Sequence, residues 1–101
     1  MTFHPVGKLE DIPEGQSKVY QVENQDIAVC NVSGKLYAIE DVCTHDGASF
    51  DQGALDGCEI ECPRHGARFD VTSGQPTELP AVIPVNVYEI RINGEIIEIN
   101  I

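Results

Sequence analysis

The sequence predicts an all-β protein with a single domain. Between its nine glycines and six prolines, segments rich in Val, Ile and Tyr alternate polar and apolar residues, and no stretch sustains a helical period. The chain has 101 residues, which leaves room for one compact domain, and a hydrophobic fraction of 42% is enough to build a core. We therefore expect residues 1–101 to form one domain of antiparallel strands.

The first part of the chain predicts a meander of three strands. Residues 18–23 and 27–32 are expected to pair across a turn at residues 24–26. A tight turn at Ser33-Gly34 then leads into a third strand at residues 36–41.

The end of the chain predicts a hairpin. Residues 86–92 and 97–101 alternate apolar and polar side chains, as strands with one buried face do. Asn93-Gly94 lies between them and is the residue pair that a type I′ turn favours.

The segment between these β-rich ends, residues 42–82, has a different character and holds three of the four cysteines. Within it Cys58, Ile60 and Cys62 fall on one face of a short strand, so that strand delivers Cys62 to the loop that follows. Cys58, in phase with Ile60, and Cys30, in an apolar strand, are expected to be buried core residues. We interpret the segment as an inserted site.

Two short motifs in this segment each combine a cysteine with a histidine. They are Cys43-Thr44-His45 and Cys62-Pro63-Arg64-His65, and each offers one soft sulfur and one borderline nitrogen to a metal. Gly47 and Gly66 follow the histidines and let the backbone fold closely around a metal centre. Four such ligands suit either one tetrahedral zinc or a two-iron, two-sulfide cluster. The mixed order favours the cluster, because zinc modules usually pair Cys with Cys and His with His.

These two motifs resemble the two-box signature of Rieske iron–sulfur proteins, and the whole chain is similar to the small Rieske ferredoxins of bacterial aromatic-ring dioxygenase systems. The resemblance implies a Rieske-like antiparallel β-sandwich or barrel. Residues 1–41 and 83–101 would form the base sheets, and residues 42–82 an inserted cluster-binding subdomain. It implies one [2Fe-2S] cluster, with Cys43 and Cys62 on the buried iron and His45 and His65 on the outer iron. A proline-rich loop at residues 74–81 would cover it.

The chain departs from the respiratory Rieske proteins in and after both boxes. Those proteins join an extra Cys in each box as a disulfide, where this chain has Ala48 and Arg64, and they place Ser and Tyr where it has Ala67 and Phe69. Hydroxyl donors stabilise the reduced cluster, and a net charge of −11 opposes an added electron. We therefore predict a potential toward the low end of the Rieske range, about −150 mV.

Several further residues flank the boxes. Phe50 and Phe69 are expected to shield the cluster, and His4 to be a surface side chain. Nearby acidic residues either steer a basic partner or only keep the surface soluble; they are Asp46, Asp51, Asp56, Glu59 and Glu61. The candidates for the cluster environment or for partner docking are Arg64, Gly47, Gly66 and Pro80, and Arg64 is equally compatible with a plain solvated side chain.

Charge and segment length exclude several classes of function. With 6 Lys and Arg against 17 Asp and Glu, the surface repels nucleic acid and anionic membranes. No stretch approaches the ~18 apolar residues of a membrane span, and the start of the chain lacks the features of a signal peptide. We expect a soluble, cytoplasmic protein.

The resemblance implies a carrier rather than an enzyme. Such a monomer takes one electron from a flavoprotein reductase and passes it to a terminal oxygenase of the aromatic-ring dioxygenase type. The alternative is a small Rieske-like subunit of a multi-subunit reductase, such as an NADH-dependent nitrite reductase. A third hypothesis is a zinc-stapled interaction module.

Overall fold

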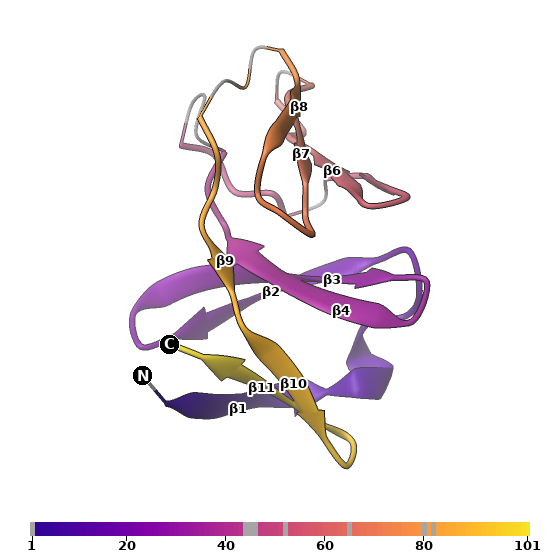
Figure 1. The fold of residues 1–101 in the computed structure, drawn as a ribbon, viewed down its shortest axis with the longest axis vertical. Coiled ribbons are helices and arrows are strands. Elements are labelled where there is room, and N and C mark those ends of the chain that lie inside the picture. Colours follow the sequence, from indigo (N-terminus) through magenta and orange to yellow (C-terminus); the bar gives the residue numbers. More distant parts are fainter. Residues whose placement is uncertain (1, 44–46, 52, 65, 80, 82) are drawn as a thin grey trace.

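Three antiparallel sheets stacked along the long axis build the molecule (Figure 1). This computed structural model describes residues 2–43, 47–51, 53–64, 66–79, 81 and 83–101. Within those residues the helical structure is one 3-10 turn, η1 (Leu9–Asp11), so the all-β prediction is confirmed.

The sheet at one end joins the two ends of the chain. It has the order β1-β11-β10, with β1 (Phe3–Lys8), β10 (Ile90–Asn93) and β11 (Ile96–Asn100). Backbone hydrogen bonds of 3.0 and 3.1 Å between Thr2 and Ile101 extend the pairing, so the termini lie side by side (Figure 1).

The central sheet contains the predicted meander. Its order is β2-β3-β4-β9, with β2 (Ser17–Val22), β3 (Gln25–Val32), β4 (Lys35–Glu40) and β9 (Val87–Tyr88). Strand β3 is buried on both faces: Ile27 and Val29 pack toward the terminal sheet, while Ala28 and Cys30 belong to a second core on the other side. The central sheet therefore contributes to both cores of the molecule.

The third sheet carries the segment of interest. Its order is β5-β6-β7-β8, with β5 (Leu55–Asp56), β6 (Glu59–Glu61), β7 (Arg68–Asp70) and β8 (Pro76–Glu78). Its strands have only two or three residues each, so the loops between them make up much of this end of the molecule. The predicted proline-rich loop at residues 74–81 is wrong in part, because Pro76–Glu78 pairs with β7 as an edge strand.

The turns differ in detail from the predictions. Glu23 and Asn24 both have positive φ (50° and 66°) and Val22 pairs directly with Gln25, so the turn has two residues and the predicted turn at 24–26 is wrong. The predicted turn at Ser33-Gly34 is confirmed, with φ of 53° and 95°.

The C-terminal hairpin is confirmed, but its turn is one residue later than predicted. Asn93 pairs with Ile96 at the end of the ladder, which leaves Gly94 and Glu95 as the loop. Of these two only Gly94 has positive φ, 65°, which is the pattern of a type II′ turn rather than type I′. The type II′ turn favours glycine at its first loop position, which explains why the loop begins at Gly94 rather than at Asn93.

Candidate metal centre

The loop after β4 closes on itself through its own backbone. The N–H of Cys43 donates to the Ala48 carbonyl at 2.7 Å, and the N–H of Gly47 donates to the Cys43 carbonyl at 2.7 Å. Gly47 has φ of 76°, a conformation that favours glycine, while a Cβ there would meet no atom within 4 Å. Gly47 is thus required by backbone conformation rather than by close packing.

The loop between β6 and β7 repeats this closure. The N–H of Cys62 donates to the Ala67 carbonyl at 2.7 Å, and the N–H of Gly66 donates to the Cys62 carbonyl at 3.1 Å. Gly66 has φ of 77°. Both segments have the sequence Cys-x-x-x-Gly-Ala. The pattern can be seen in the sequence, but only these hydrogen bonds show that it closes a loop.

The two loops deliver their cysteines to one apolar core. Cys43 and Cys62 are buried in the cluster that also contains Phe50 and Phe69, whose rings meet edge to face with centroids 5.4 Å apart. Ala67 lies in the same cluster and is fully buried. Phe50 and Phe69 were expected to shield the cluster as core residues, and their place in the core is confirmed.

This arrangement fits a thiolate-bound metal. Two soft cysteine sulfurs on separately closed loops would suit iron or zinc, and the apolar side chains around them would keep water away from the sulfurs. Among the residues that the structure describes, no group of three His, Cys, Asp or Glu side chains is arranged so that it could hold a metal ion. The predicted ligands His45 and His65, together with Pro80 and Asp46, lie outside the described residues.

Asp41 fixes the first loop from outside, a role that the sequence did not reveal. Its carboxylate accepts hydrogen bonds from Ser49 Oγ at 2.6 Å and from the Phe50 N–H at 2.7 Å. Because Asp41 directly follows β4, it ties the residues after the loop to the end of that strand.

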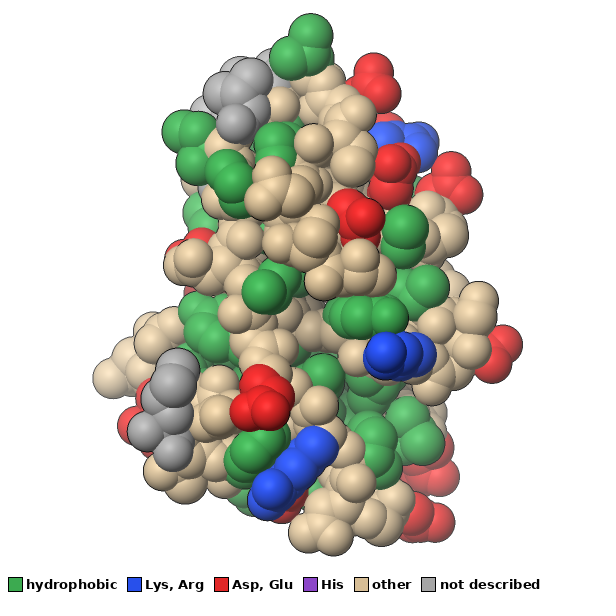
Figure 2. All heavy atoms as spheres, viewed as in Figure 1, with side chains coloured by type: hydrophobic (Ala, Val, Ile, Leu, Met, Phe, Trp, Pro, Cys, Tyr) green, Lys and Arg blue, Asp and Glu red, His purple; other side chains and the backbone are tan. Residues whose placement is uncertain are grey.

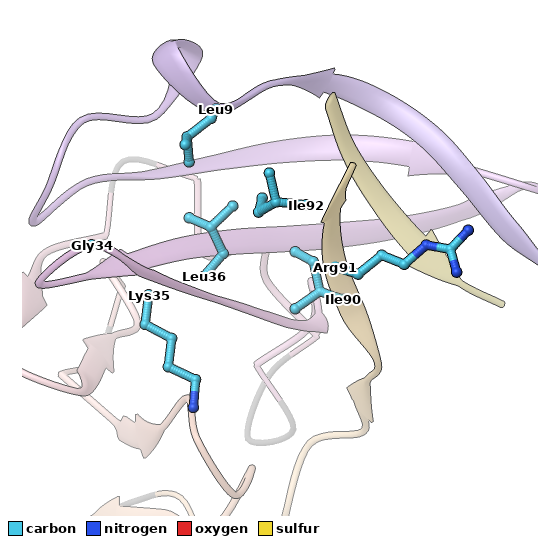
Figure 3. Close-up of a pocket in the computed structure, with 7 residues that line it drawn as sticks. All are labelled: Leu9, Gly34, Lys35, Leu36, Ile90, Arg91 and Ile92. Carbon is cyan, nitrogen blue, oxygen red and sulfur yellow. The ribbon is translucent and has the colours of Figure 1, made fainter. Parts of the chain in front are cut away.

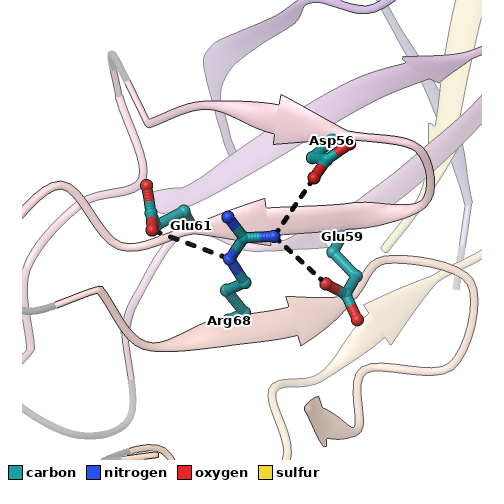
Figure 4. Close-up of polar contacts among 4 residues, drawn as sticks. All are labelled: Asp56, Glu59, Glu61 and Arg68. Atoms are coloured by element: carbon teal, nitrogen blue, oxygen red, sulfur yellow. Dashed lines mark hydrogen bonds and ion pairs between the residues drawn. The ribbon is translucent and has the colours of Figure 1, made fainter. Parts of the chain in front are cut away.

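Arg68 lies beside the end of the second loop and was also missed by sequence reasoning. Its guanidinium lies among three carboxylates: Asp56 at 3.3 Å, Glu59 at 3.4 Å and Glu61 at 3.6 Å (Figure 4). Hydrogen bonds donated to Asp56 and Glu59 raise the pKa of Arg68 above its ordinary value. Arg68 and Glu61 face each other across β6 and β7, a pairing that follows from strand register rather than from spacing along the chain.

The residues around the two loops differ in exposure and in charge. Arg64 and Gly47 are exposed and Gly66 is half-buried. Beyond β8, Leu79 is 75% exposed and Ile83 is 58% exposed, whereas Ala81 between them is buried. Acidic side chains surround a basic one over the region of β6 (Figure 2, upper right).

The two remaining cysteines have different environments. Cys30 is fully buried, as predicted, and burial followed by the nearby charge of Asp41 raises its pKa to about 12. Cys58 is only half-buried, so its prediction as a core residue is wrong. The reason is that β6 begins at Glu59, which leaves Cys58 in the turn beside Gly57.

Two features lie far from the loops. His4 is partly buried rather than a plain surface side chain, and its Nδ1 lies 3.6 Å from a carboxylate oxygen of Glu23. A hollow of about 220 Å³ opens between η1, β4 and β10 at the other end of the molecule (Figure 3). Its lining is largely aliphatic and comprises Leu9, Gly34, Lys35, Leu36, Ile90, Arg91 and Ile92.

In the part of the chain described, no helix has the length and apolar character of a membrane span.

Comparison with known proteins connects these loops to a family. The model of the Rieske [2Fe-2S] domain matches residues 2–89. The ferredoxin component of a naphthalene 1,2-dioxygenase system from Pseudomonas aeruginosa is 38% identical over 93 residues, which cover 92% of this chain and 89% of that protein.

Solved structures agree over nearly the full length. The ferredoxin of carbazole 1,9a-dioxygenase from Nocardioides aromaticivorans IC177 superposes with a TM-score of 0.93 at 35% identity, covering 98% of this chain and 97% of that one. A chain in a complex of reduced oxygenase and oxidized ferredoxin of carbazole 1,9a-dioxygenase gives 0.90 at 35% identity, with 96% and 91% covered. A protein provisionally named as an NADPH nitrite reductase small subunit shares only the fold, at 16% identity and a TM-score of 0.84. With a family model that matches residues 2–89, a matching fold and a relative that covers 92% of its length, this chain belongs to the Rieske [2Fe-2S] domain family.

Proposed function

We propose that this protein is a one-electron carrier of an aromatic-ring dioxygenase system. Its cofactor is one Rieske-type [2Fe-2S] cluster, which supplies reversible uptake and release of a single electron. The observation that carries the proposal is the pair of identically closed loops, each delivering a buried cysteine to one apolar core.

In this proposal Cys43 and Cys62 bind the inner iron, and His45 and His65 bind the outer iron. Both residues are buried, with 0% of Cys43 and 1% of Cys62 exposed, which supports an inner position for their iron. Residues 42–82 act as the cluster-binding subdomain, and residues 1–41 and 83–101 act as its base. The third sheet, formed by strands between Leu55 and Glu78, supports that division.

The proposed partners are a flavoprotein reductase as donor and a terminal oxygenase as acceptor. Relatives named as ferredoxin components of dioxygenase systems support this role, and so does the likeness to a chain from an oxygenase–ferredoxin complex. We propose that the protein works as a cytoplasmic monomer and that it catalyses no reaction of its own. Its part is to hold the cluster, exclude water from the sulfurs and dock with each partner in turn.

The charge of the protein suits transient docking. With a net charge of −11 it attracts a partner surface rich in Lys and Arg, and such attraction weakens as salt screens it. We expect electron delivery to an oxygenase to slow as ionic strength rises. A rate independent of salt would contradict electrostatic steering.

Spectroscopy and metal analysis of the purified protein test the cofactor and its ligands. Anaerobically purified protein should contain two irons and two sulfides per chain, and its reduced form should give an electron spin resonance signal of low average g value. Cys43→Ser should abolish the cluster, while Cys30→Ser, in the same core, should retain it. A colourless protein with one zinc per chain would overturn the proposal and favour the zinc module.

Gel filtration and reconstitution test the role as a free carrier. A carrier runs as a monomer and supports electron flow from a separate reductase to cytochrome c. Stable co-purification with a large subunit would instead favour the alternative of a reductase subunit. The likeness to the protein named as a nitrite reductase small subunit, at 16% identity, supports only the shared fold.

A further inference from the structure

Arg68 lies at the neck of the second ligand loop. The loop begins at Cys62 and ends at Ala67, where the Cys62 N–H donates to the Ala67 carbonyl. Glu61 and Arg68 are the next residues outward on the two strands, and they face each other in register. Their ion pair therefore lies directly beside the hydrogen bond that closes the loop.

The same guanidinium spans three strands. Arg68 extends from β7, Glu59 and Glu61 belong to β6, and Asp56 ends β5 (Figure 4). One side chain therefore connects three of the four strands of this sheet, all except β8. These strands have two or three residues each and therefore few ladder hydrogen bonds of their own. Holding this sheet in shape depends more on side chains than it would in a longer sheet.

The charged face and the metal-binding face are the two sides of the same strands. Glu59 and Glu61 alternate with the buried Ile60, and Cys62 continues the buried side; Arg68 is likewise followed by the buried Phe69. Three carboxylates behind the loop, with one guanidinium among them, leave a local charge of about −2 if all are ionised. Without the guanidinium, that charge would be −3.

We propose that Arg68 is a positioning residue of the cluster, which holds the second ligand loop closed and offsets the carboxylates behind it so that the cluster is easier to reduce. This inference rests on the proposed function, because it concerns the cluster that the loop would hold. Among the described residues, the ion pairs of Arg68 are with carboxylates rather than with a cysteine, so it acts through the neck of the loop and through its charge. The side chain is 31% exposed, so salt weakens but does not remove its effect.

Full-length holoprotein variants test the proposal through two measurements, the midpoint potential and the rate at which a chelator removes iron. Arg68→Gln removes the charge and the ion pairs together. Arg68→Lys keeps the charge but offers a compact ammonium that cannot pair in the planar, forked manner of a guanidinium. Arg91→Gln is the control, because it makes the same change of charge at the opposite end, where Arg91 pairs with Glu98 at 2.6 Å.

The expected results separate charge from geometry. Arg68→Gln should lower the midpoint potential, with a larger shift at low ionic strength, and should speed iron loss about two- to fivefold, as expected for an exposed ion pair. Arg68→Lys should speed iron loss but leave the potential near that of the unmodified protein. Arg91→Gln should leave the rate of iron loss unchanged and move the potential less.

The proposal is overturned if Arg68→Gln shifts the potential no more than Arg91→Gln, or if it loses iron no faster than the unmodified protein. A merely structural role would speed iron loss in Arg68→Gln without lowering the potential, so that result also overturns it. Failure of the proposed function is a different observation: the unmodified protein would itself bind no iron–sulfur cluster.

Discussion

Replacing Ala67 by serine should raise the reduction potential. Ala67 is fully buried in the core that holds both cysteines, and its carbonyl already accepts the Cys62 N–H at 2.7 Å. Because that carbonyl is already engaged, a serine hydroxyl at this position must donate to a different acceptor, or it stays without a hydrogen bond inside an apolar site. The respiratory Rieske proteins, which have serine where this chain has Ala67, suggest the sulfurs of the cluster and of its cysteines as the acceptors.

The size of the shift follows from the strength of one hydrogen bond. A net gain of about 0.5–1.5 kcal/mol in the reduced state corresponds to about 20–65 mV, since a tenfold change is about 59 mV for one electron. The starting potential is expected at about −150 mV, and Ala67→Ser should raise this potential by some tens of millivolts. Direct electrochemistry on a protein film, or a titration followed by visible absorption, measures it.

Ala28→Ser is the matched control for this change. Ala28 is 1% exposed and belongs to the same core, but it lies on β3 of the central sheet rather than on a ligand loop. The control should cost stability and leave the potential unchanged. A shift of zero or of negative sign in Ala67→Ser, or equal upward shifts in both variants, would refute the reasoning.

Three further changes probe the base of the loops and the core. Asp41→Asn should weaken the first loop by about 1 kcal/mol, because the amide nitrogen cannot accept the hydroxyl hydrogen bond that the carboxylate receives, and thermal unfolding measures the loss. Gly53→Ala should destabilise by about 1–3 kcal/mol, since its Cβ would collide with the backbone carbonyl oxygen of Glu61. Gly57→Ala, with φ of 60° and open space around it, should cost only about 1 kcal/mol. The Cys30 thiol, with a pKa of about 12 against 9.0 ordinarily, should contribute stability that is complete below pH 9 and declines between pH 9 and 12, and Cys30→Ala should remove that decline in unfolding experiments.

Each of these predictions has a contradicting result. Equal unfolding midpoints for Asp41→Asn and the unmodified protein would show that the carboxylate does not hold the loop. Equal losses in the two glycine variants would show that close packing at Gly53 is relieved by movement of the chain. An unchanged slope with pH in Cys30→Ala would assign the alkaline decline to other groups.

Local sequence signals predicted the parts of the fold that depend on short-range chemistry. The meander and the C-terminal hairpin follow from alternation and from Gly and Asn near the turns. The errors at the hairpin turns concern single residues: Glu23 takes a positive φ that its type rarely adopts, and Gly94 rather than Asn93 opens the last turn. A neighbouring Gly or Asn marks a turn but does not state which of two registers the strands will choose.

The sequence predicted the two cysteines of the candidate site from the residue types and spacing of its motifs. The pattern of the two boxes led to Cys43 and Cys62, and the structure buries both in one core. Arg68 and Asp41 were not predictable in the same way, because their partners lie 7 to 12 residues away in sequence or across a strand pair. Such contacts become visible only when register and loop path are known.

The two loops share one pattern of backbone closure although they leave different sheets. In each, the cysteine N–H donates to the carbonyl of the alanine five residues later, and the glycine N–H donates to the carbonyl of the cysteine. Each loop also has an anchor beside it, Asp41 next to the first and Arg68 next to the second. For protein design, this points to building an iron–sulfur site from two such loops around a small apolar core, each transferred together with its anchor.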